Sequence, residues 1–263
     1  MKKYFGIFQH IKDSYPEYIH EVPLYYEEAA TLYDQLSVSY DDYPAFYEHA
    51  LLYGSPVLEL CCGSGRITLP LLKAGFGITA VDLSDDMLAK LQIQLNGRYR
   101  RFSSNIDVVK ADMTKLQLND KYNLIIIGAT SIRLMEEDFT AFFNQMYAML
   151  NDGGCFLFNF EDIPDCINEK EVYEQTLVTD LKEDTGVPSI MCMQRMINYD
   201  DKRASVNFIK TMWDEKKILL TQTDYRIFSK EDIKKHAIQS NFKSCEIVHV
   251  NQNNYFCKMI RNT

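Results

Sequence analysis

Short apolar runs alternate with helical patterns through the middle of the chain. Between residues 57 and 162 the apolar runs are VLELC, ITAVD, IDVVKAD, YNLIIIGAT and GCFLFNFED. The segments between them, such as RITLPLLKAG and EDFTAFFNQMYAML, carry apolar residues at helical spacing. Buried strands separated by helices are typical of a mainly parallel sheet with helices on both faces. The pattern predicts an α/β fold with a Rossmann-like sheet.

The flanking segments show other periods. Residues 25–36 and 41–52 have helical patterns, and the second pattern ends near Gly54. From about residue 170 to 228 the chain reads as long strands with turn signals, which favours an antiparallel sheet. Ser229 to Asp232 match a capping box that begins a helix through Gln239, and two strand-like runs follow in residues 243–260.

These shifts predict four segments. We expect an N-terminal helical cover at residues 1–54 and a cofactor-binding core at residues 55–163. A β-rich lid is expected at residues 164–228, and a C-terminal helix with the closing strands of the core at residues 229–263. The length of 263 residues suits one large α/β domain with an accessory lid.

Composition narrows the function classes. Hydrophobic residues make up 46% of the chain, and 37 acidic against 28 basic residues give a formal net charge of −9. Such acidity weighs against nucleic acid as a partner, because a nucleic-acid groove needs clustered basic side chains. No stretch approaches the ~18 consecutive apolar residues of a membrane-spanning helix. The start, MKKYFGIFQHIKDSYPE, is a poor signal peptide.

The seven cysteines form no C-x-x-C pair. An odd number without metal-ligand spacing predicts a reduced, cytoplasmic protein with no metal site. The lack of a long apolar stretch predicts no membrane partner.

A glycine turn and an acid frame the first two core strands. Gly63 and Gly65 follow the first strand, where glycine lets the backbone turn sharply and approach a ligand closely. Asp82 ends the next strand, where a carboxylate can accept hydrogen bonds from two ribose hydroxyls. A tight turn with a helix-capping acid is the alternative interpretation.

Two residues argue against a dinucleotide as this ligand. Thr68 stands where a dinucleotide fingerprint needs its third glycine. Glu59 lies inside the first strand, where a buried carboxylate is costly without a partner. An acidic strand end suits the cationic S-adenosylmethionine, which carries a sulfonium and an ammonium but no phosphate.

With these elements the chain resembles the class I S-adenosylmethionine-dependent methyltransferases. Their first motif, E/D-x-G-x-G-x-G, is similar to residues 59–65, with Cys61 in place of the first glycine. The resemblance implies a seven-stranded sheet and S-adenosylmethionine as methyl donor, with S-adenosylhomocysteine as product. It also implies donor-binding roles for Glu59, Cys61, Gly63, Gly65, Asp82, Leu83, Met87, Asp112, Met113, Gly128 and Ala129.

In that family the acid after strand three meets the adenine, and the end of strand four flanks the methionine part of the donor. The resemblance assigns these places to Asp112 and to Gly128-Ala129-Thr130.

A narrower resemblance links the chain to bacterial N,N-dimethyltransferases of nucleotide-linked amino sugars. Tyr25 and Tyr33-Asp34 match two N-terminal tyrosines that close over the donor in that group, and residues 130–134 match a loop. The chain departs at Arg133, near which those enzymes carry a histidine. The lid pattern is shared with other small-amine methyltransferases, so the resemblance implies a small-molecule acceptor.

Methyl transfer from a sulfonium depends mainly on alignment and exclusion of water. Three side chains are candidates for catalytic contacts. Glu161, after the fifth strand, could steer an ammonium or accept a proton, although a solvated turn before Pro164 fits equally. Arg133 could anchor a carboxylate or phosphate, with a surface arginine as the alternative. His20 is the only histidine kept as a candidate base.

The sequence therefore predicts an S-adenosylmethionine-dependent methyltransferase acting on a small molecule, with an amine nitrogen favoured, in a biosynthetic setting. A small-molecule O-methyltransferase and a non-catalytic protein that binds the donor are the alternatives. The acceptor, the number of methyl groups and the oligomeric state stay open, with a homodimer as one form to test.

Overall fold

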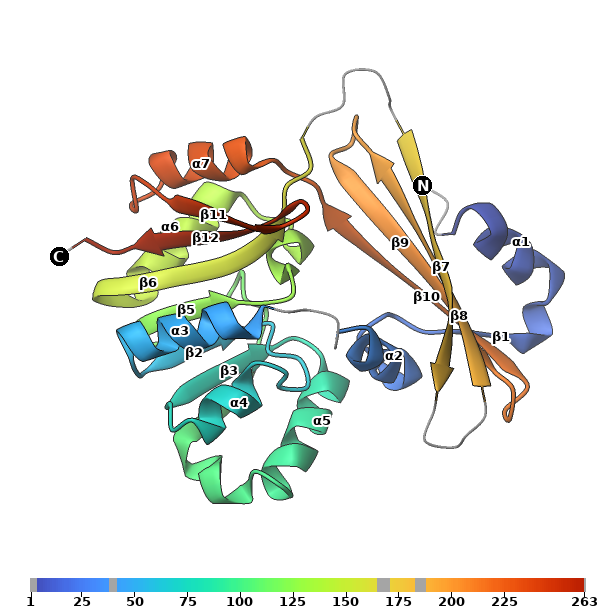
Figure 1. The fold of residues 1–263 in the computed structure, drawn as a ribbon, viewed down its shortest axis with the longest axis horizontal. Helices are drawn as coiled ribbons and strands as arrows, with labels where there is room; N and C mark the ends of the chain where they lie inside the picture. The colour runs from blue at the N-terminus through green and yellow to red at the C-terminus, as the bar shows by residue number, and fades with distance from the viewer. Residues whose placement is uncertain (1–3, 38–41, 165–170, 183–187, 263) are drawn as a thin grey trace. The chain divides into compact units, whose positions relative to one another are not determined.

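The computed structural model describes residues 4–37, 42–164, 171–182 and 188–262. The chain forms two compact units, coloured along the chain in Figure 1. One unit combines residues 1–36 with 165–227, and the other combines residues 37–164 with 228–263. This division differs from the expected single cover of residues 1–54, because the first strand of the chain joins the lid sheet while the helix before Gly54 packs on the core sheet.

The core unit is built on a seven-stranded sheet, as expected from the resemblance. Its order is β11-β12-β6-β5-β2-β3-β4, and the strands from β2 to β6 are parallel, with β12 antiparallel to β6 and β11 antiparallel to β12. The bounds of these strands are β2 (Val57–Leu60), β3 (Ile78–Asp82), β4 (Ile106–Lys110), β5 (Tyr122–Ile127), β6 (Leu150–Glu161), β11 (Glu246–Asn251) and β12 (Asn254–Ile260).

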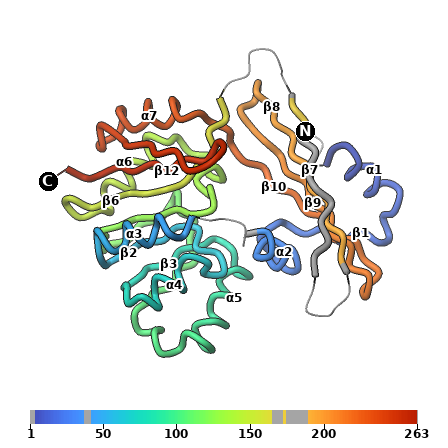
Figure 2. Tube along the Cα trace, in the orientation of Figure 1, coloured from blue at the N-terminus to red at the C-terminus, as the bar shows by residue number. Residues whose placement is uncertain are grey.

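Helices cover both faces of this sheet (Figures 1 and 2). The apolar cluster on one face includes side chains from α3 (Tyr43–Tyr53), α4 (Thr68–Lys73) and α5 (Asp85–Asn96). The cluster on the other face includes side chains from α6 (Phe139–Met149) and α7 (Lys230–Gln239). The short 3-10 helices η2 (Arg100–Asn105) and η3 (Ser131–Leu134) lie in the connections after α5 and β5.

Two helix starts can be compared with the expectations. The capping box at Ser229 is present, since the Ser229 side chain accepts from the Asp232 N–H and the Asp232 side chain accepts from the Ser229 N–H. The helix expected to begin at Asp41 begins at Tyr43, and Asp41 itself lies outside the described residues.

The strand order places a topological switch at β2. The chain runs from β2 outward to β3 and β4 and then returns to the other side of β2 with β5. The connections after β2 and β5 therefore separate at the carboxyl ends of these two strands. Open α/β sheets bind their ligands at such a point.

The lid unit contains a five-stranded sheet of order β1-β10-β9-β8-β7. Its strands are β1 (Ile19–Glu21), β7 (Glu171–Lys182), β8 (Pro188–Asn198), β9 (Arg203–Met212) and β10 (Lys217–Arg226). The four long strands pair antiparallel, as expected, whereas the short β1 adds in parallel to β10. The helices of this unit are α1 (Gly6–Ser14), η1 (Pro16–Tyr18) and α2 (Glu27–Ser37).

An apolar cluster joins the N-terminal segment to the lid sheet. Tyr4 and Phe8 are each 1% exposed and pack with Ile209 of β9 and Leu220 of β10. Burial of these side chains explains why the first residues belong to the lid unit.

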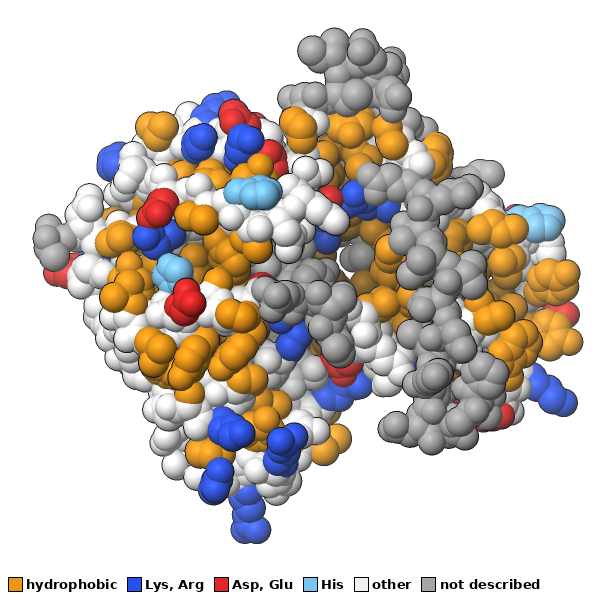
Figure 3. Space-filling model, viewed as in Figure 1, with side chains coloured by type: hydrophobic (Ala, Val, Ile, Leu, Met, Phe, Trp, Pro, Cys, Tyr) orange, Lys and Arg blue, Asp and Glu red, His pale blue; other side chains and the backbone are white. Residues whose placement is uncertain are grey.

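In the described part of the chain, no helix has the length and apolar character needed to cross a bilayer. Hydrophobic side chains do gather at the surface over α3 (Figure 3), where Leu51 and Leu52 are 62% and 73% exposed.

Candidate active site

The connection after β2 is a turn that depends on glycine. Gly63 and Gly65 have φ angles of 56° and 95°, which L-residues with a side chain rarely adopt. A Cβ atom on Gly65 would lie 2.6 Å from Leu91 Cδ1 and 2.9 Å from Leu69 Cγ. The missing side chains therefore let this turn pack directly against α4 and α5.

Cys61 takes a glycine-like conformation at the place where the motif departs from its usual form. Its φ angle is 56°, in the left-handed region, which is a strained conformation for a residue with a Cβ. The Cys61 Sγ lies 3.5 Å from Met113 Sδ. The fold has thus kept the turn of the motif and gained a sulfur contact at the cost of strain.

Replacing Cys61 should reveal that strain. We expect Cys61→Gly to raise the free energy of unfolding by about 1 kcal/mol, since relief of ~1–3 kcal/mol of strain exceeds the entropic cost of glycine. Cys61→Ala, which keeps the Cβ and loses the sulfur contact, should be less stable than the wild type. Urea unfolding of the three proteins gives the order, and an alanine variant more stable than the glycine variant would contradict the interpretation.

The Asp82 carboxylate closes the glycine turn. Asp82 ends β3, where its Oδ2 accepts from the Gly63 N–H at 2.8 Å and its Oδ1 accepts from the Ser84 N–H at 2.9 Å. Burial raises the pKa of Asp82 above its ordinary value, although these backbone donors act in the opposite direction. The effect of lost hydration on the pKa is therefore larger than the effect of the backbone hydrogen bonds. The carboxylate oxygens have further lone pairs that can accept hydrogen bonds from other donors.

Apolar side chains flank Asp82 and the turn. Met87 is 2% exposed, and its Cε would lie 3.3 Å from a Cβ on Gly63. Leu83, directly after Asp82, is 57% exposed, and Met113 is 7% exposed. An exposed leucine next to buried methionines gives this edge an apolar surface beside a carboxylate.

Asp112 supplies a second carboxylate after β4. Its Oδ1 accepts from the Thr114 hydroxyl at 2.7 Å and from the Thr114 N–H at 3.0 Å, and Lys115 Nζ lies 3.3 Å from its Oδ2. The Thr114 hydroxyl is the main cause that lowers the pKa of Asp112 below its ordinary value. Asp112 and Asp82 both raise the pKa of the Cys61 thiol electrostatically, in addition to the larger effect of burial.

The end of β5 is held by residues that the sequence did not single out. The Ala129 N–H donates to Asp42 Oδ2 at 3.0 Å, and the Thr130 N–H donates to Asn159 Oδ1 at 2.8 Å. Arg66, which follows Gly65, donates to the same Asp42 carboxylate through both terminal nitrogens. No sequence signal could have paired Asp42 with residues so far along the chain.

A family model described as a methyltransferase domain matches residues 57–154. A protein of Geobacillus sp. (strain WCH70) named as a methyltransferase is 27% identical over 130 residues, which are 49% of this chain and 50% of that protein. The chain thus matches about half the length of the curated relatives.

Solved structures share the fold over most of the chain. An S-adenosylmethionine-dependent methyltransferase from Clostridium acetobutylicum ATCC 824 has a TM-score of 0.66 at 18% identity, over 90% of this chain and 98% of that chain. The glycopeptide N-methyltransferase MtfA, in complex with S-adenosyl-L-methionine, has 0.59 at 18% identity, over 97% of both chains. An amino pentose methyltransferase from Micromonospora echinaspora has 0.64 at 15% identity, over 92% and 100%.

Residues 57–154 match the methyltransferase-domain family, and the fold of the chain is that of S-adenosylmethionine-dependent methyltransferases. The matched domain, the sheet order and the glycine turn with its acid agree on this point.

The two residues that depart from a dinucleotide fingerprint, Glu59 and Thr68, are partners. Glu59 is 2% exposed, and the Thr68 hydroxyl donates to its Oε2 at 2.6 Å. Thr68 occupies the place of the third glycine of a dinucleotide fingerprint, so one contact accounts for both departures. Burial raises the pKa of Glu59 to about 8. Glu59 is thus mostly uncharged at neutral pH and adds little negative charge to this edge.

The two side chains expected to contact the acceptor, Arg133 and Glu161, contact each other. Arg133 in η3 donates to Glu161 Oε2 at 2.8 Å, and the two side chains are 20% and 18% exposed. The sequence predicted independent roles for them, with Glu161 contacting a cationic group and Arg133 contacting an anionic group. The fold brings them together as an ion pair at the carboxyl edge of β5 and β6.

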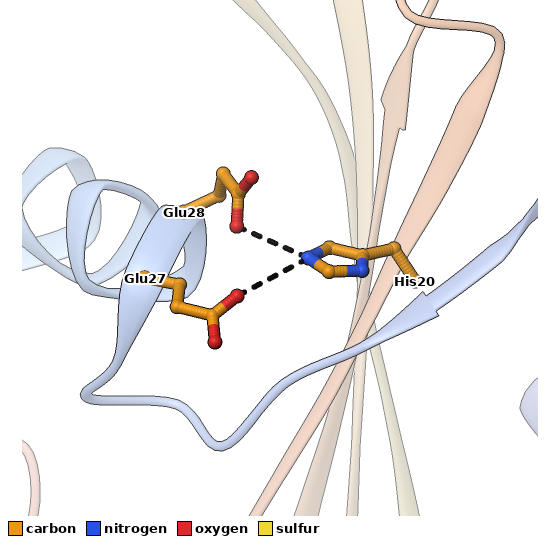
Figure 4. A group of neighbouring side chains, drawn as sticks. All are labelled: His20, Glu27 and Glu28. Atoms are coloured by element: carbon orange, nitrogen blue, oxygen red, sulfur yellow. Dashed lines mark hydrogen bonds and ion pairs between the residues drawn. The ribbon is translucent and has the colours of Figure 1, made fainter.

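The remaining predicted site residues lie in the lid unit. The Tyr25 and Tyr33 rings form an edge-to-face pair with centroids 5.0 Å apart. His20 Nε2 lies 3.1 Å from Glu28 Oε2 and 3.5 Å from Glu27 Oε2 (Figure 4). The donor-covering role of the tyrosines and the base role of His20 stay predictions.

Proposed function

We propose that this protein transfers a methyl group from S-adenosylmethionine to a small molecule, with an amine nitrogen as the acceptor. The observation that carries the donor assignment is the Asp82 carboxylate, which is bonded to the glycine turn and poor in hydration. The hydroxyls of a ribose would supply further donors to this half-buried carboxylate.

The surrounding residues fit the rest of the donor. Gly63 and Gly65 have φ angles of 56° and 95°, and this sharp turn would place backbone N–H groups beside the donor. Asp112, whose pKa is lowered, is ionised at neutral pH and would accept from the adenine amino group. Leu83, Met87 and Met113 would pack on the adenine ring, and Gly128 with Ala129 would flank the methionine part.

The donor's sulfonium supplies an activated methyl group, so the protein contributes mainly position. Asp82 and the glycine turn hold the nucleoside, and the fixed β5 end limits how the rest of the donor can lie. A neutral amine needs alignment with the methyl carbon and exclusion of water, and a strong base is optional. We assign the Arg133–Glu161 pair, as a unit, to polar contact with the acceptor.

Two of the structurally similar proteins support the acceptor class. One is named as a glycopeptide N-methyltransferase and one as an amino pentose methyltransferase. Their similarity at 18% and 15% identity shows the fold alone, so the amine and the biosynthetic setting are our proposal.

Paired acceptors test the proposal. We expect calorimetry to show binding of S-adenosylmethionine and S-adenosylhomocysteine, and mass spectrometry to show methylation of amino sugars but not of the matched sugars with a hydroxyl at the same carbon. The rate should rise with pH through the pKa of the acceptor amine, because only the neutral amine attacks.

Other results would replace this proposal by a defined alternative. Methylation of the hydroxyl partner, with dependence on a protein base, would identify an O-methyltransferase. Tight donor binding without turnover of any acceptor in the panel would identify a non-catalytic protein.

A further inference from the structure

The backbone directly after β5 is strained. Ala129 and Thr130 have φ angles of 52° and 55°, so two consecutive residues with side chains lie in the left-handed region. Each such residue costs on the order of 1–3 kcal/mol and persists only when its surroundings hold it in place. Neighbouring side chains therefore have to hold this turn in place.

The side chains of Asp42 and Asn159 hold this turn through hydrogen bonds. The Ala129 N–H donates to Asp42 Oδ2 at 3.0 Å, and the next N–H, of Thr130, donates to Asn159 Oδ1 at 2.8 Å. Asn159 Nδ2 in turn donates to Asp42 Oδ2 at 3.0 Å. Both side chains are buried, with 5% and 6% exposure. One carboxylate and one amide thus hold two successive strained peptide groups.

Arg66 ties the same carboxylate to the glycine turn. Its NH2 donates to Asp42 Oδ2 at 3.0 Å, and its NH1 donates to Asp42 Oδ1. A Cβ on Gly128 would lie 2.3 Å from Ile67 Cδ1 and 3.5 Å from Asp42 Oδ2, so the two connections are in close contact here. A shift of Asp42 would therefore displace both the connection after β2 and the connection after β5.

We infer that Asp42 is a positioning residue for the amino-acid end of the methyl donor. It fixes the β5 end relative to the glycine turn, while Asp82 fixes the nucleoside. This inference rests on the proposed function, because it takes the donor to lie along this edge with its methionine part beside Ala129.

Two ligands can distinguish binding at the amino-acid end of the site from binding at the nucleoside end. S-adenosylhomocysteine has both the adenosine and the amino-acid part, and 5′-methylthioadenosine lacks the amino-acid part. Asp42→Asn should weaken S-adenosylhomocysteine by about tenfold or more, because an ionised acceptor bonds a backbone N–H roughly twice as strongly as a neutral one. The affinity for 5′-methylthioadenosine should stay within about twofold, whereas Asp82→Ala should weaken both ligands.

Controls keep the experiment decisive if Asp42→Asn folds poorly. Asn159→Ala removes the Thr130 acceptor and one donor to Asp42, and should show the same split between the two ligands. Asp107→Asn, at an exposed position of β4, should bind both ligands as the wild type does. Thermal unfolding of each variant reports whether the fold is intact.

Equal weakening of both ligands by Asp42→Asn and Asn159→Ala would overturn the inference and leave a purely structural network. Unchanged affinity for both ligands would overturn it as well. If the wild type binds neither ligand, the proposed function itself fails, and the inference fails with it.

Discussion

Replacing Glu59 with glutamine should remove a large part of the pH dependence of the core's stability. Burial raises the pKa of Glu59 to about 8 in the folded protein, against an ordinary value of 4.5. Between these values the folded protein holds a proton that the unfolded chain has released. The free energy of unfolding therefore falls as pH rises, by about 1.4 kcal/mol per pH unit from this group. The stabilisation is complete below about pH 4.5 and is lost by about pH 8.

The comparison with Glu59→Gln isolates this effect from all other titrations. Glutamine keeps the shape, and its carbonyl can still accept from the Thr68 hydroxyl, but it does not titrate. We expect the difference in unfolding free energy between variant and wild type to change by about 4 kcal/mol from pH 5 to pH 8, in favour of the variant at high pH.

Denaturant unfolding at four pH values measures this difference. Glu48→Gln, at an exposed position of α3, is the matched control and should follow the wild type at every pH. Parallel curves for Glu59→Gln and the wild type would show that Glu59 is ionised in the folded protein.

Asp82→Ala should weaken binding of both S-adenosylmethionine and S-adenosylhomocysteine. The variant loses the proposed acceptor for the ribose hydroxyls and also the acceptor for the Gly63 N–H. Losing a hydrogen bond to a charged group costs about 1–3 kcal/mol, which corresponds to about 5- to 150-fold in affinity.

A second substitution separates the two roles of Asp82. Asp82→Asn retains one acceptor oxygen and should fall between the wild type and Asp82→Ala in donor affinity. Calorimetry with both ligands gives the values, and thermal unfolding identifies any loss of fold. Unchanged affinity in a folded Asp82→Ala variant would remove the basis of the donor assignment.

The core could be predicted from the sequence because its signals are local. Each strand from β2 to β6 is a short apolar run bounded by turn residues or by a helical pattern, and the periods of strand and helix differ. The glycine turn and Asp82 lie within one strand–helix–strand unit of about 25 residues, so their meeting follows from the crossover connection. The same holds for Met87, which lies in the first turn of α5, five residues after Asp82.

The N-terminal segment was harder to predict. Residues 6–14 and 19–21 form α1 and β1, which are short and are stabilised by contacts with the lid sheet. A three-residue strand exists only because β10 offers an edge to pair with. Its partner lies about 200 residues later in the chain, and local pattern contains no information about such pairing.

By itself the sequence determined the alternation of strands and helices in the core and the residues of the glycine turn. Only the tertiary structure decided which charged side chains are buried and which partners they have. It buried Glu59 against Thr68, paired Arg133 with Glu161, and placed Asp42 under the β5 end. Charge and hydrogen bonding depend on burial and on neighbours that are distant in the chain, whereas hydrophobic period depends on residues a few positions apart.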